Sequence, residues 1–447
     1  MKRLFGTDGV RGVAGEPPLD ALSVRRFGAA LGEVLHGRVG RNPRVVLGRD
    51  TRESGPWLRD AVAAGLASRG ATSVDVGIVS TPGLAFCVPH GGFDAGVMIS
   101  ASHNAYQDNG LKVLGARGTK LSDAQEMEVE RLILDEGIAD PGPAAAAVVE
   151  DAALLDPYVA FLESVVPAGR LDGVRLVLDC AHGSATALAP LVFDQLGAEV
   201  ACVGCAPDGR NINLGCGSLH LDALASHVRD GKFDLGLAFD GDADRCLAVD
   251  GEGRAVDGDH ILYLTARRLH RQGRLRNDAV VATVMSNLWL EHRLAEDGIR
   301  LLRAQVGDKY VHERMMAEGA VLGGEQSGHI IFREVAEAGD GILTGILLLD
   351  AVLDEGKPLH ALLRDVVPYP QVLLNVRVRE KPDLRQHPVI GPAVGEAESA
   401  LDGSGRVLLR YSGTEPLARV MVEGKDAEVV RRHAERLVEV IRRELGA

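Results

Sequence analysis

An apolar run, a polar loop and an amphipathic stretch follow one another three times along the chain. The three copies are residues 44–48 with 57–68, residues 174–179 with 185–196, and residues 279–284 with 288–296. Each copy predicts a strand, a loop and a helix, because a short apolar run bounded by turn residues is typical of a buried strand. Connections of helix length favour parallel or mixed sheets whose faces are covered by helices. The pattern therefore predicts the α/β class.

The last part of the chain lacks this repeat. Residues 371–379 alternate like a strand, residues 406–410 and 419–422 predict two more strands, and residues 426–445 predict a long helix. This tail is predicted to be α+β.

Three breaks in the pattern divide the chain into four predicted domains. A stretch rich in proline, glycine and alanine over residues 140–147 predicts a linker before a boundary near residue 155. Softer breaks lie near residue 255, after an acidic loop, and near residue 367, where residues 366–370 interrupt a helical pattern. The predicted domains are the three α/β units 1–155, 156–255 and 256–367 and the α+β unit 368–447.

The composition is that of a soluble globular protein. The 447 residues include 49 Lys and Arg against 63 Asp and Glu, a formal net charge of −14, with 46% hydrophobic and 25% charged residues. This balance excludes a disordered or fibrous chain. An acidic chain without a run of five Lys and Arg repels a phosphate backbone, so no nucleic-acid partner is predicted.

No feature of the sequence predicts a membrane protein. The start of the chain breaks into Gly6 and Asp8 before an apolar signal-peptide core could form, so we expect a cytoplasmic protein. The longest apolar stretch, residues 342–349, ends at Asp350, well short of the ~20 residues that a membrane helix needs.

Six cysteines raise two alternatives. Cys202 and Cys205 have zinc-like spacing, and Cys216 could add a third ligand. A structural zinc site usually has four ligands, and a second Cys pair at this spacing is missing, so free thiols are favoured.

The loop after residue 99 reads Ser100-Ala101-Ser102-His103-Asn104. Small residues let a backbone approach an anion, and a serine hydroxyl can act as a nucleophile or phosphate carrier if a neighbour polarises it. Adjacent side chains in an extended chain point in opposite directions, so a Ser-His pair taken alone is weak evidence for catalysis. A plain polar turn is the alternative.

A second loop carries the strongest pattern. Asp240, Asp242 and Asp244 stand at alternate positions directly after the apolar residues 235–239. Carboxylates are hard oxygen ligands suited to magnesium or calcium, and without a cation they repel one another. An EF-hand is excluded, because its twelfth position requires Glu and Gly251 stands there. We therefore favour a metal site over a solvated acidic turn.

Two further loops offer binding groups. Residues 323–329 present Glu325 and Ser327 between glycines, suited either to sugar hydroxyls or to a tight turn. Residues 410–416, with Arg419 just beyond, combine arginine, hydroxyl groups and a free backbone, as a phosphate cradle requires; a plain hairpin turn is the alternative.

Lysine is scarce in this chain, with 8 Lys against 41 Arg. A lysine whose pKa is lowered can give up its proton near neutral pH, whereas arginine cannot. Lys112 and Lys309, both close to marked loops, are therefore candidates for proton transfer or for movable phosphate contacts.

Together, these loops resemble the α-D-phosphohexomutase superfamily over essentially the whole chain. The resemblance rests on Phe5-Gly-Thr-Asp-Gly-Val-Arg-Gly12, Ile-Ser-Ala-Ser-His-Asn, Asp-Gly-Asp-Ala-Asp-Arg and Gly-Glu-Gln-Ser-Gly-His. These forms are similar to those of bacterial members that act on glucosamine phosphates. Members that act on mannose or glucose phosphates more usually show Thr-Gly-Ser-His-Asn-Pro, Asp-Gly-Asp-Gly-Asp-Arg and Gly-Glu-Met-Ser-Gly-His. Ala105 departs from the family, which generally has proline after Ser-His-Asn.

The resemblance implies four domains around a central cleft, the first three with mixed sheets. It implies interconversion of glucosamine 6-phosphate and glucosamine 1-phosphate, on the route to UDP-N-acetylglucosamine and cell-wall precursors. Ser102 would carry the phosphoryl group, with glucosamine 1,6-bisphosphate as intermediate, or glucose 1,6-bisphosphate as activator. The sugar would turn round in the cleft between the two transfers.

The resemblance also implies roles for individual residues. Mg²⁺ would be held by Asp240, Asp242, Asp244 and an oxygen of the Ser102 phosphate. The residues around the transferring group would be Arg11, His103, Arg245 and Lys112, with Lys112 as acid/base. The substrate-binding set would be Glu325, Ser327, His329, Lys309, Arg410, Ser412, Gly413, Thr414 and Arg419.

Three rival functions stay open at this point. A glucose or mannose phosphomutase with relaxed sugar choice differs only in preferring a hydroxyl to an amine at C2. A hydrolase would lose the Ser102 phosphate to water, and a sugar-phosphate sensor would bind without turnover.

Overall fold

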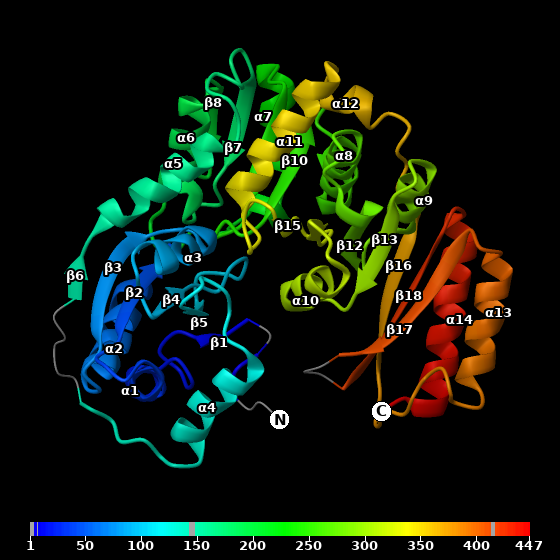
Figure 1. The fold of residues 1–447 in the computed structure, drawn as a ribbon. Coiled ribbons are helices and arrows are strands. Elements are labelled where there is room, and N and C mark those ends of the chain that lie inside the picture. The colour runs from blue at the N-terminus through cyan, green and yellow to red at the C-terminus, as the bar shows by residue number, and fades with distance from the viewer. Residues whose placement is uncertain (1–3, 7, 143–147, 413–415) are drawn as a thin grey trace.

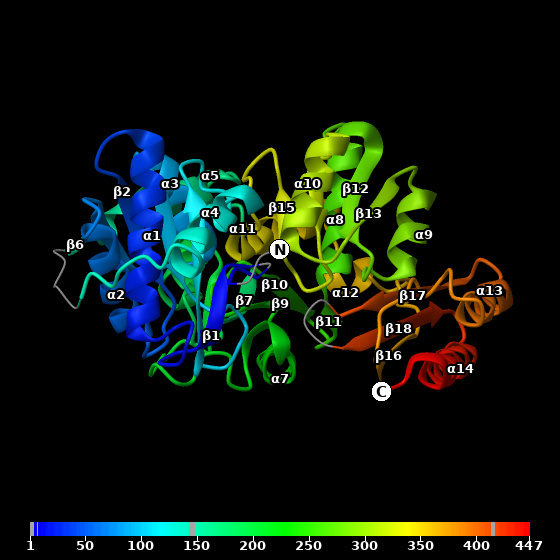
Figure 2. The same cartoon turned by 90° about the horizontal axis from the view of Figure 1, so that it is seen from below.

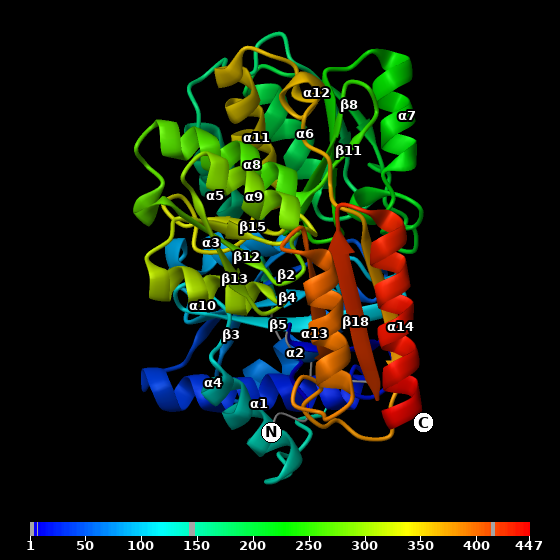
Figure 3. The same cartoon turned by 90° about the vertical axis from the view of Figure 1, so that its right-hand side faces the viewer.

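Four separate β-sheets organise the described residues of this computed structural model, which are 4–6, 8–142, 148–412 and 416–447. Each sheet and its helices form one unit, and the four units follow one another along an arc with the first and fourth at its two ends (Figure 1). The view from below shows the same succession, and in the view from the side the fourth unit, with β18, α13 and α14, lies in front (Figures 2 and 3). The α/β architecture expected from the repeated pattern is confirmed.

The first unit contains a six-stranded mixed sheet in the order β1-β5-β4-β2-β3-β6. Its strands are β1 (Val10–Val13), β2 (Arg44–Arg49), β3 (Thr72–Ile78), β4 (Ala95–Ile99), β5 (Asp108–Gly115) and β6 (Val148–Glu150), and its helices are α1 (Ala21–Val39), α2 (Gly55–Ala67), α3 (Thr81–His90) and α4 (Asp123–Leu134). Strand β2 pairs in parallel with β3 and β4, whereas β5 is antiparallel to both β1 and β4. The predicted strand 44–48 and helix 57–68 correspond to β2 and α2.

The second unit contains a five-stranded mixed sheet in the order β11-β10-β9-β7-β8. Its elements are η1 (Ala152–Leu155), α5 (Asp156–Ser164), β7 (Arg175–Asp179), α6 (Ala185–Gln195), β8 (Glu199–Val203), η2 (Gly217–Leu219), α7 (Asp222–Gly231), β9 (Leu235–Phe239), β10 (Cys246–Asp250) and β11 (Ala255–Val256). All five residues of β9 are buried, as expected of a central strand covered on both faces.

The third unit contains a four-stranded mixed sheet in the order β13-β12-β14-β15. Its elements are α8 (Gly258–Arg271), η3 (Arg276–Asp278), β12 (Ala279–Thr283), α9 (Leu288–Glu296), β13 (Arg300–Ala304), α10 (Asp308–Glu318), β14 (Leu322–Gly324), β15 (Ile330–Phe332), α11 (Gly341–Glu355) and α12 (Leu359–Leu362). The predicted helix 288–296 has the bounds of α9. The apolar run 342–349 lies within α11, and in the described part of the chain no helix could cross a membrane.

The fourth unit is the α+β tail. An antiparallel sheet in the order β16-β18-β17 packs against two helices. Its elements are β16 (Gln371–Arg377), α13 (Ile390–Leu401), β17 (Gly405–Tyr411), β18 (Leu417–Gly424) and α14 (Ala427–Leu445). Helix α13 was not predicted, because two glycines and a proline, Gly391, Pro392 and Gly395, hide its apolar periodicity.

The second and third units share one hydrophobic core. A single cluster of buried side chains runs from Tyr158 in α5 to Leu363 beyond α12. Helix α11 belongs to the third unit in sequence but packs against β10 and α6 of the second. The first and fourth units have cores of their own.

The first three sheets each carry one of the marked loops. The serine loop follows β4, the Asp240 loop follows β9, and residues 325–329 connect β14 to β15. The first two loops extend from the carboxyl ends of strands that pair in parallel with a neighbour, which is where α/β sheets place their binding groups.

Candidate active site

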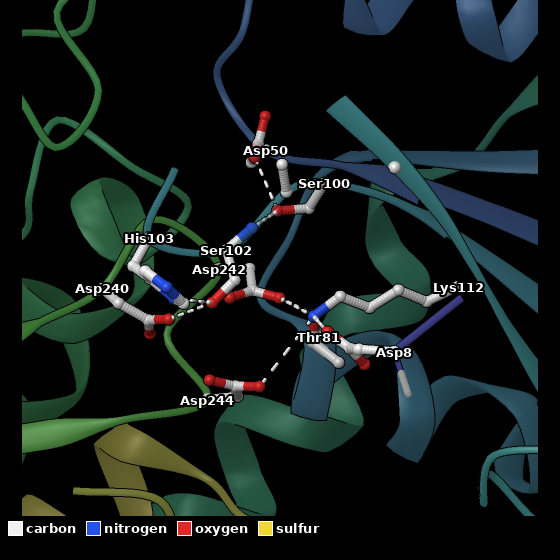
Figure 4. A network of polar contacts seen from close by, with 12 residues as sticks. Asp8, Asp50, Thr81, Ser100, Ser102, His103, Lys112, Asp240, Asp242 and Asp244 are labelled. Carbon is white, nitrogen blue, oxygen red and sulfur yellow. Dashed lines mark hydrogen bonds and ion pairs between the residues drawn. The ribbon is translucent and has the colours of Figure 1, made fainter. Parts of the chain in front are cut away.

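Ser102 lies on a sharp turn at the junction of the first and second units. It is 2% exposed, and its φ of 54° is in the left-handed region. Its Oγ donates to Asp240 Oδ2 at 2.6 Å and lies 3.3 Å from His103 Nδ1 (Figure 4). The assumption of an extended Ser-His pair is therefore wrong, because the left-handed turn brings the two side chains together.

A relay of short hydrogen bonds fixes the backbone beneath this turn. The Ser102 N–H donates to Ser100 Oγ at 2.9 Å, and Ser100 Oγ donates to Asp50 Oδ2 at 2.6 Å (Figure 4). Asp50 is fully buried, and burial raises its pKa despite the opposing charge of Arg52. The turn therefore rests on a buried carboxylate at the end of β2.

Arg52 and Asn213 hold the carbonyl groups of the serine loop. The Arg52 side chain is fully buried; Nε pairs with Asp50 at 2.8 Å, and Nη2 donates to the carbonyls of Ser102 and Asn104 at 3.0 and 2.9 Å. Its Nη1 donates to the carbonyls of Ala105 and Asp108. Asn213 Nδ2 reaches the carbonyls of Ser102 and Asn104 from the second unit. These contacts restrain the loop where Ala105 replaces the family's proline.

The Asp240 loop approaches the serine loop very closely. A side chain at Gly241 would place its Cβ 2.5 Å from the Ser102 carbonyl oxygen, and one at Gly183 would collide with Gly241 itself. Thr81 binds the loop from the first unit, since its N–H donates to the Asp242 carbonyl at 2.9 Å. Only glycine permits this contact between backbones.

The three aspartates form a group that fits a hard divalent cation. One oxygen from each of Asp240, Asp242 and Asp244 lies within 4.8 Å of the others, and all three residues are buried. Asp242 Oδ1 and Asp244 Oδ1 are buried atoms without a hydrogen-bond partner. Burial, followed by the charges of the other two aspartates, raises the pKa of Asp240 well above its usual value. Three crowded carboxylates with unpartnered oxygens are the donor set that Mg²⁺ or Ca²⁺ binds.

Lys112 is a buried ammonium among carboxylates. Its Nζ lies 2.7 Å from Asp242 Oδ2, 3.0 Å from Asp8 Oδ2 and 3.9 Å from Asp244 Oδ2 (Figure 4). Burial lowers the pKa of Lys112, but these carboxylates outweigh that effect and raise it well above the usual value. The expectation of a lowered pKa at Lys112 is therefore wrong in this arrangement, where the side chain carries its proton near neutral pH.

Arg11 and Arg245 flank the serine turn. Arg11 Nη1 donates to the Ala101 carbonyl at 3.3 Å, and Arg245 Nη1 lies 3.3 Å from His103 Nδ1. Burial and then these two guanidinium groups lower the pKa of His103 to about 4. His103 is therefore neutral near pH 7, and two fixed positive charges stand beside Ser102.

The loop from Glu325 to His329 closes on itself and faces the same space. Glu325 Oε1 accepts from the Gly307 N–H at 2.9 Å, and Ser327 Oγ donates to Glu325 Oε2 at 3.2 Å. His329 Nδ1 lies 3.7 Å from Asp244. Burial lowers the pKa of His329, but Asp244 and other carboxylates outweigh it and raise the pKa to about 9. The imidazole is therefore positively charged near neutral pH.

A cavity of about 440 Å³ connects these groups. Its charged and polar lining residues are Asp8, Arg11, Ser102, His103, Lys120, Asp244, Arg245, Asp308, Glu325 and His329. It is large enough for a small polar ligand such as a sugar phosphate.

Three of the lining residues were not singled out from the sequence. Lys120 Nζ lies 2.5 Å from Asp8 Oδ1 and 2.6 Å from Asp308 Oδ2, joining the first unit to the third. The scarcity of lysine that marked Lys112 also applied to Lys120, and Asp8 lies inside the opening Phe5–Gly12 stretch. Asp308 stands next to Lys309, which was a candidate. The sequence therefore marked the neighbourhood of each of the three residues, but not the contacts between them.

One expected binding residue, Lys309, lies elsewhere. Lys309 Nζ pairs with Asp123 at the start of α4 and does not line the cavity. Gln326, in the Glu325–His329 loop, does not line the cavity either; its Nε2 donates to Asp257 Oδ2 at 3.0 Å. Gln326, which stands where Met is more usual, therefore supports the loop through its bond to Asp257.

The predicted phosphate cradle belongs to the fourth unit, at the other end of the arc. Arg410 and Arg419 are directly opposite each other on β17 and β18, and burial, then Arg419, lowers the pKa of Arg410. Ser412 is buried, and its carbonyl accepts from Lys381 Nζ at 2.7 Å. Two adjacent guanidinium groups on neighbouring strands favour an anion. Gly413 and Thr414 lie outside the described residues.

The cysteines carry free thiols. Cys87, Cys180 and Cys246 are buried, and the pair with zinc-like spacing, Cys202 and Cys205, is more accessible. Among the described residues, the group of ligand atoms that converges is the aspartate triad.

Comparison with known proteins places the whole chain in one family. Four models of the phosphoglucomutase/phosphomannomutase family match in succession: alpha/beta/alpha domain I at residues 2–138, domain II at 156–253, domain III at 257–369 and the C-terminal domain at 373–440.

Relatives cover the full length. The phosphoglucosamine mutase of Solibacter usitatus is 49% identical over 100% of this chain and 99% of its own, and that of Deinococcus deserti is 50% identical over 98% of both. A phosphoglucomutase/phosphomannomutase family protein from Burkholderia thailandensis has a similar structure, with a TM-score of 0.80 at 25% identity over 99% of this chain and 98% of that one. A putative phosphomannomutase from Thermus thermophilus matches with a TM-score of 0.77 at 24% identity over 97% and 98%. With four matching domain models in the order of its four sheets, and relatives at about half identity from end to end, the chain belongs to the phosphoglucomutase/phosphomannomutase family of the α-D-phosphohexomutase superfamily.

Proposed function

We propose that this enzyme is a phosphoglucosamine mutase, which interconverts glucosamine 6-phosphate and glucosamine 1-phosphate through a phosphoserine at Ser102 and a 1,6-bisphosphate intermediate. Full-length relatives of that name at 49% and 50% identity support the substrate. The product would serve the synthesis of UDP-N-acetylglucosamine and cell-wall precursors. Each of the four proposed domains, 1–155, 156–255, 256–367 and 368–447, supplies one of the loops.

The observation that carries the proposal is the position of Ser102. Its Oγ lies 2.6 Å from Asp240 Oδ2, lines the cavity, and stands beside the cationic side chains of Arg11 and Arg245. Phosphoryl transfer depends mainly on positioning and on stabilising negative charge, and this serine has both kinds of support. The left-handed turn presents the hydroxyl to the ligand space.

The aspartate triad would hold the divalent cation, which we propose to be Mg²⁺. Asp240, Asp242 and Asp244, together with an oxygen of the Ser102 phosphate, would be its ligands. When bound, the ion neutralises negative charge on the transferring phosphoryl group. Lys112 keeps its ammonium beside Asp242 and Asp8, so it adds positive charge to the same region.

The chain's own residues then account for the transfer. The Ser102 Oγ–P bond breaks as a sugar hydroxyl oxygen bonds to the phosphorus and gives up its proton. The Lys112 ammonium is the proposed acid/base: it donates a proton to Ser102 Oγ as that oxygen leaves, and the resulting amine accepts the proton of the sugar hydroxyl. Glu325 and Ser327 would bind the sugar hydroxyls in either orientation.

The second transfer runs in the opposite sense. The bisphosphate turns round in the cavity, and its other phosphate returns to Ser102 with the proton movements reversed. Arg410, Ser412, Gly413, Thr414 and Arg419 would grip the phosphate that is not reacting. The paired guanidinium groups on β17 and β18 support this assignment.

A coupled assay for glucosamine 1-phosphate tests the proposal. Glucosamine 6-phosphate is supplied with Mg²⁺ and a trace of glucose 1,6-bisphosphate, and the wild type is compared with Ser102→Ala. We expect turnover by the wild type and none by the variant. Turnover by Ser102→Ala would refute the phosphoserine mechanism.

The same assay separates the rival functions. Activity on glucose or mannose 1-phosphate with none on glucosamine 6-phosphate would keep the family and change the sugar. Stoichiometric release of inorganic phosphate would indicate a hydrolase, and binding without turnover would indicate a sensor.

A further inference from the structure

Asp308 is a carboxylate in the cavity that takes no part in the steps above. It is the first residue of α10 and lines the cavity together with Ser102 and Glu325. Its Oδ2 accepts from Lys120 Nζ at 2.6 Å, and its Oδ1 accepts from the backbone N–H of Lys309 at 2.8 Å. His329 Nε2 lies 4.0 Å from Oδ2. The third unit therefore presents a fixed negative charge to the space that receives the sugar.

The Lys120 ammonium shows which kind of group this carboxylate accepts. Lys120 comes from the first unit, and its Nζ is shared between Asp308 Oδ2 at 2.6 Å and Asp8 Oδ1 at 2.5 Å. If a second ammonium approaches Asp308, Lys120 keeps Asp8 as its partner. After the exchange, every one of these charged groups therefore still has an opposite charge beside it. A buried charge without such a partner would be costly.

The other carboxylates of the cavity differ from Asp308, whose partner Lys120 is shared with Asp8. Asp8 has three cations within 3.0 Å, namely Arg11, Lys112 and Lys120. Asp244 belongs to the aspartate triad. Both oxygens of Glu325 accept hydrogen bonds from within the third unit. Among the described residues that line the cavity, Asp308 is the carboxylate best placed to receive a cationic substrate group.

We propose that Asp308 binds the 2-ammonium group of the glucosamine phosphate and so selects an amino sugar over a sugar with a hydroxyl at C2. This inference rests on the function proposed above. A hydrogen bond between two charged groups favours the ammonium over a neutral hydroxyl by roughly 10- to 100-fold. The sugar turns round during turnover, so Asp308 meets the amine in one of the two orientations, and loss of that contact is enough to lower kcat/KM.

The test is the ratio of kcat/KM for glucosamine 6-phosphate to kcat/KM for glucose 6-phosphate. Where glucose 6-phosphate turns over too slowly to be measured, the reciprocal of its inhibition constant is used in place of its kcat/KM. Asp308→Asn keeps the size of the side chain and removes its charge, so we expect the ratio to fall at least tenfold. An unchanged ratio in a folded variant would overturn the inference, because a purely structural role lowers both values together.

Asp123→Asn is the matched control. Asp123 pairs with Lys309 across the same two units but does not line the cavity. We expect its ratio to equal that of the wild type; an equal fall in both variants would assign the effect to contact between the units and refute amine binding.

A pH series of the same ratio on the wild type tests the inference without any substituted protein. As the pH rises through the pKa of the sugar amine, the ratio should fall, because glucose 6-phosphate corrects for titration of the enzyme. A flat ratio would refute the inference. If the wild type does not turn over glucosamine 6-phosphate at all, it is the proposed function that fails.

Discussion

Arg52 is predicted to position the serine loop although it does not line the cavity. Its side chain is fully buried, it pairs with Asp50, and it donates to four backbone carbonyls of residues 102–108. Removing one member of a buried ion pair costs about 3–5 kcal/mol, because the other charge is left uncompensated. Two of the four carbonyls keep Asn213 as a donor, so the loop loses part of its support rather than all of it.

The perturbation is Arg52→Met, which preserves length and removes every donor. We expect a loss of about 4 kcal/mol, a large part of the 5–15 kcal/mol that stabilises a typical domain. Urea unfolding followed by circular dichroism measures the stability, and the coupled assay measures turnover per folded molecule. We expect turnover to fall by roughly tenfold or more, because a displacement of about 1 Å at the nucleophile is enough for such a loss.

Two variants separate stability from positioning. Arg59→Met removes a different guanidinium of the same unit. Arg59 Nη1 lies 2.6 Å from Oδ2 of the buried Asp75, and both residues are far from the serine loop in sequence. This variant should lower stability and leave turnover per folded molecule unchanged. Asp50→Asn combined with Arg52→Met removes the uncompensated charge, so stability should recover in part while turnover stays low. Wild-type turnover by folded Arg52→Met would refute the reasoning.

Three further predictions concern the metal, the lysine and a buried carboxylate. Asp242→Ala should abolish Mg²⁺-dependent turnover in a protein that still folds, and unchanged activity in Mg²⁺ would remove the metal assignment. Lys112→Arg keeps the charge but should lower kcat by roughly 10² or more in the coupled assay, the usual worth of a general acid or base; a near-normal rate would exclude that role. Burial raises the pKa of Asp340 to about 6, whereas an unfolded Asp has a pKa near 3.9. Because the folded state binds this proton more tightly, stability falls as the pH rises from about 4 to about 6, by about 3 kcal/mol over the two units. Asp340→Asn retains an N-cap for α11 and should remove that part of the slope in urea unfolding measured between pH 4 and pH 7, and an unaltered slope would contradict the assignment.

The serine loop and the aspartate loop could be found in the sequence because each is a local pattern after a strand. The alternation of Asp240, Asp242 and Asp244 needs no tertiary information, and the structure brings their oxygens within 4.8 Å. The relation of Ser102 to His103 could not be found this way. That relation depends on the left-handed turn at Ser102, which no nearby residue type predicts. Arg52 and Asn213 stabilise the turn by donating to the carbonyls around it.

The charged partners of the site are separated by more than 100 residues, which is why they were missed. Lys112 meets Asp242 from 130 positions away, and Lys120 meets Asp308 from 188. A pKa depends on such partners, so the scarcity of lysine could mark Lys112 but could not show that three carboxylates raise its pKa. The shared core of the second and third units was likewise invisible, because the periodicity of α11 shows an apolar face without showing which sheet it covers.

The contacts around the site divide into two kinds, and the division matches the two tasks of a mutase. Between the first and second units the contacts are buried: the side chains of Ser102 and Asp240 bond to each other, and backbone meets backbone at Thr81 with Asp242 and at Gly241 with the Ser102 carbonyl. Between the first and third units lie two partly exposed ion pairs, Lys120–Asp308 in the cavity and Lys309–Asp123 outside it. Exposed ion pairs contribute about 0–1 kcal/mol each, whereas the buried contacts are costly to break. The buried contacts, together with the core that the second and third units share, therefore keep the serine beside the aspartates, while the ion pairs can exchange partners at small cost. A sugar that turns round between two transfers needs that combination, because its polar partners have to change while the geometry of phosphoryl transfer stays fixed.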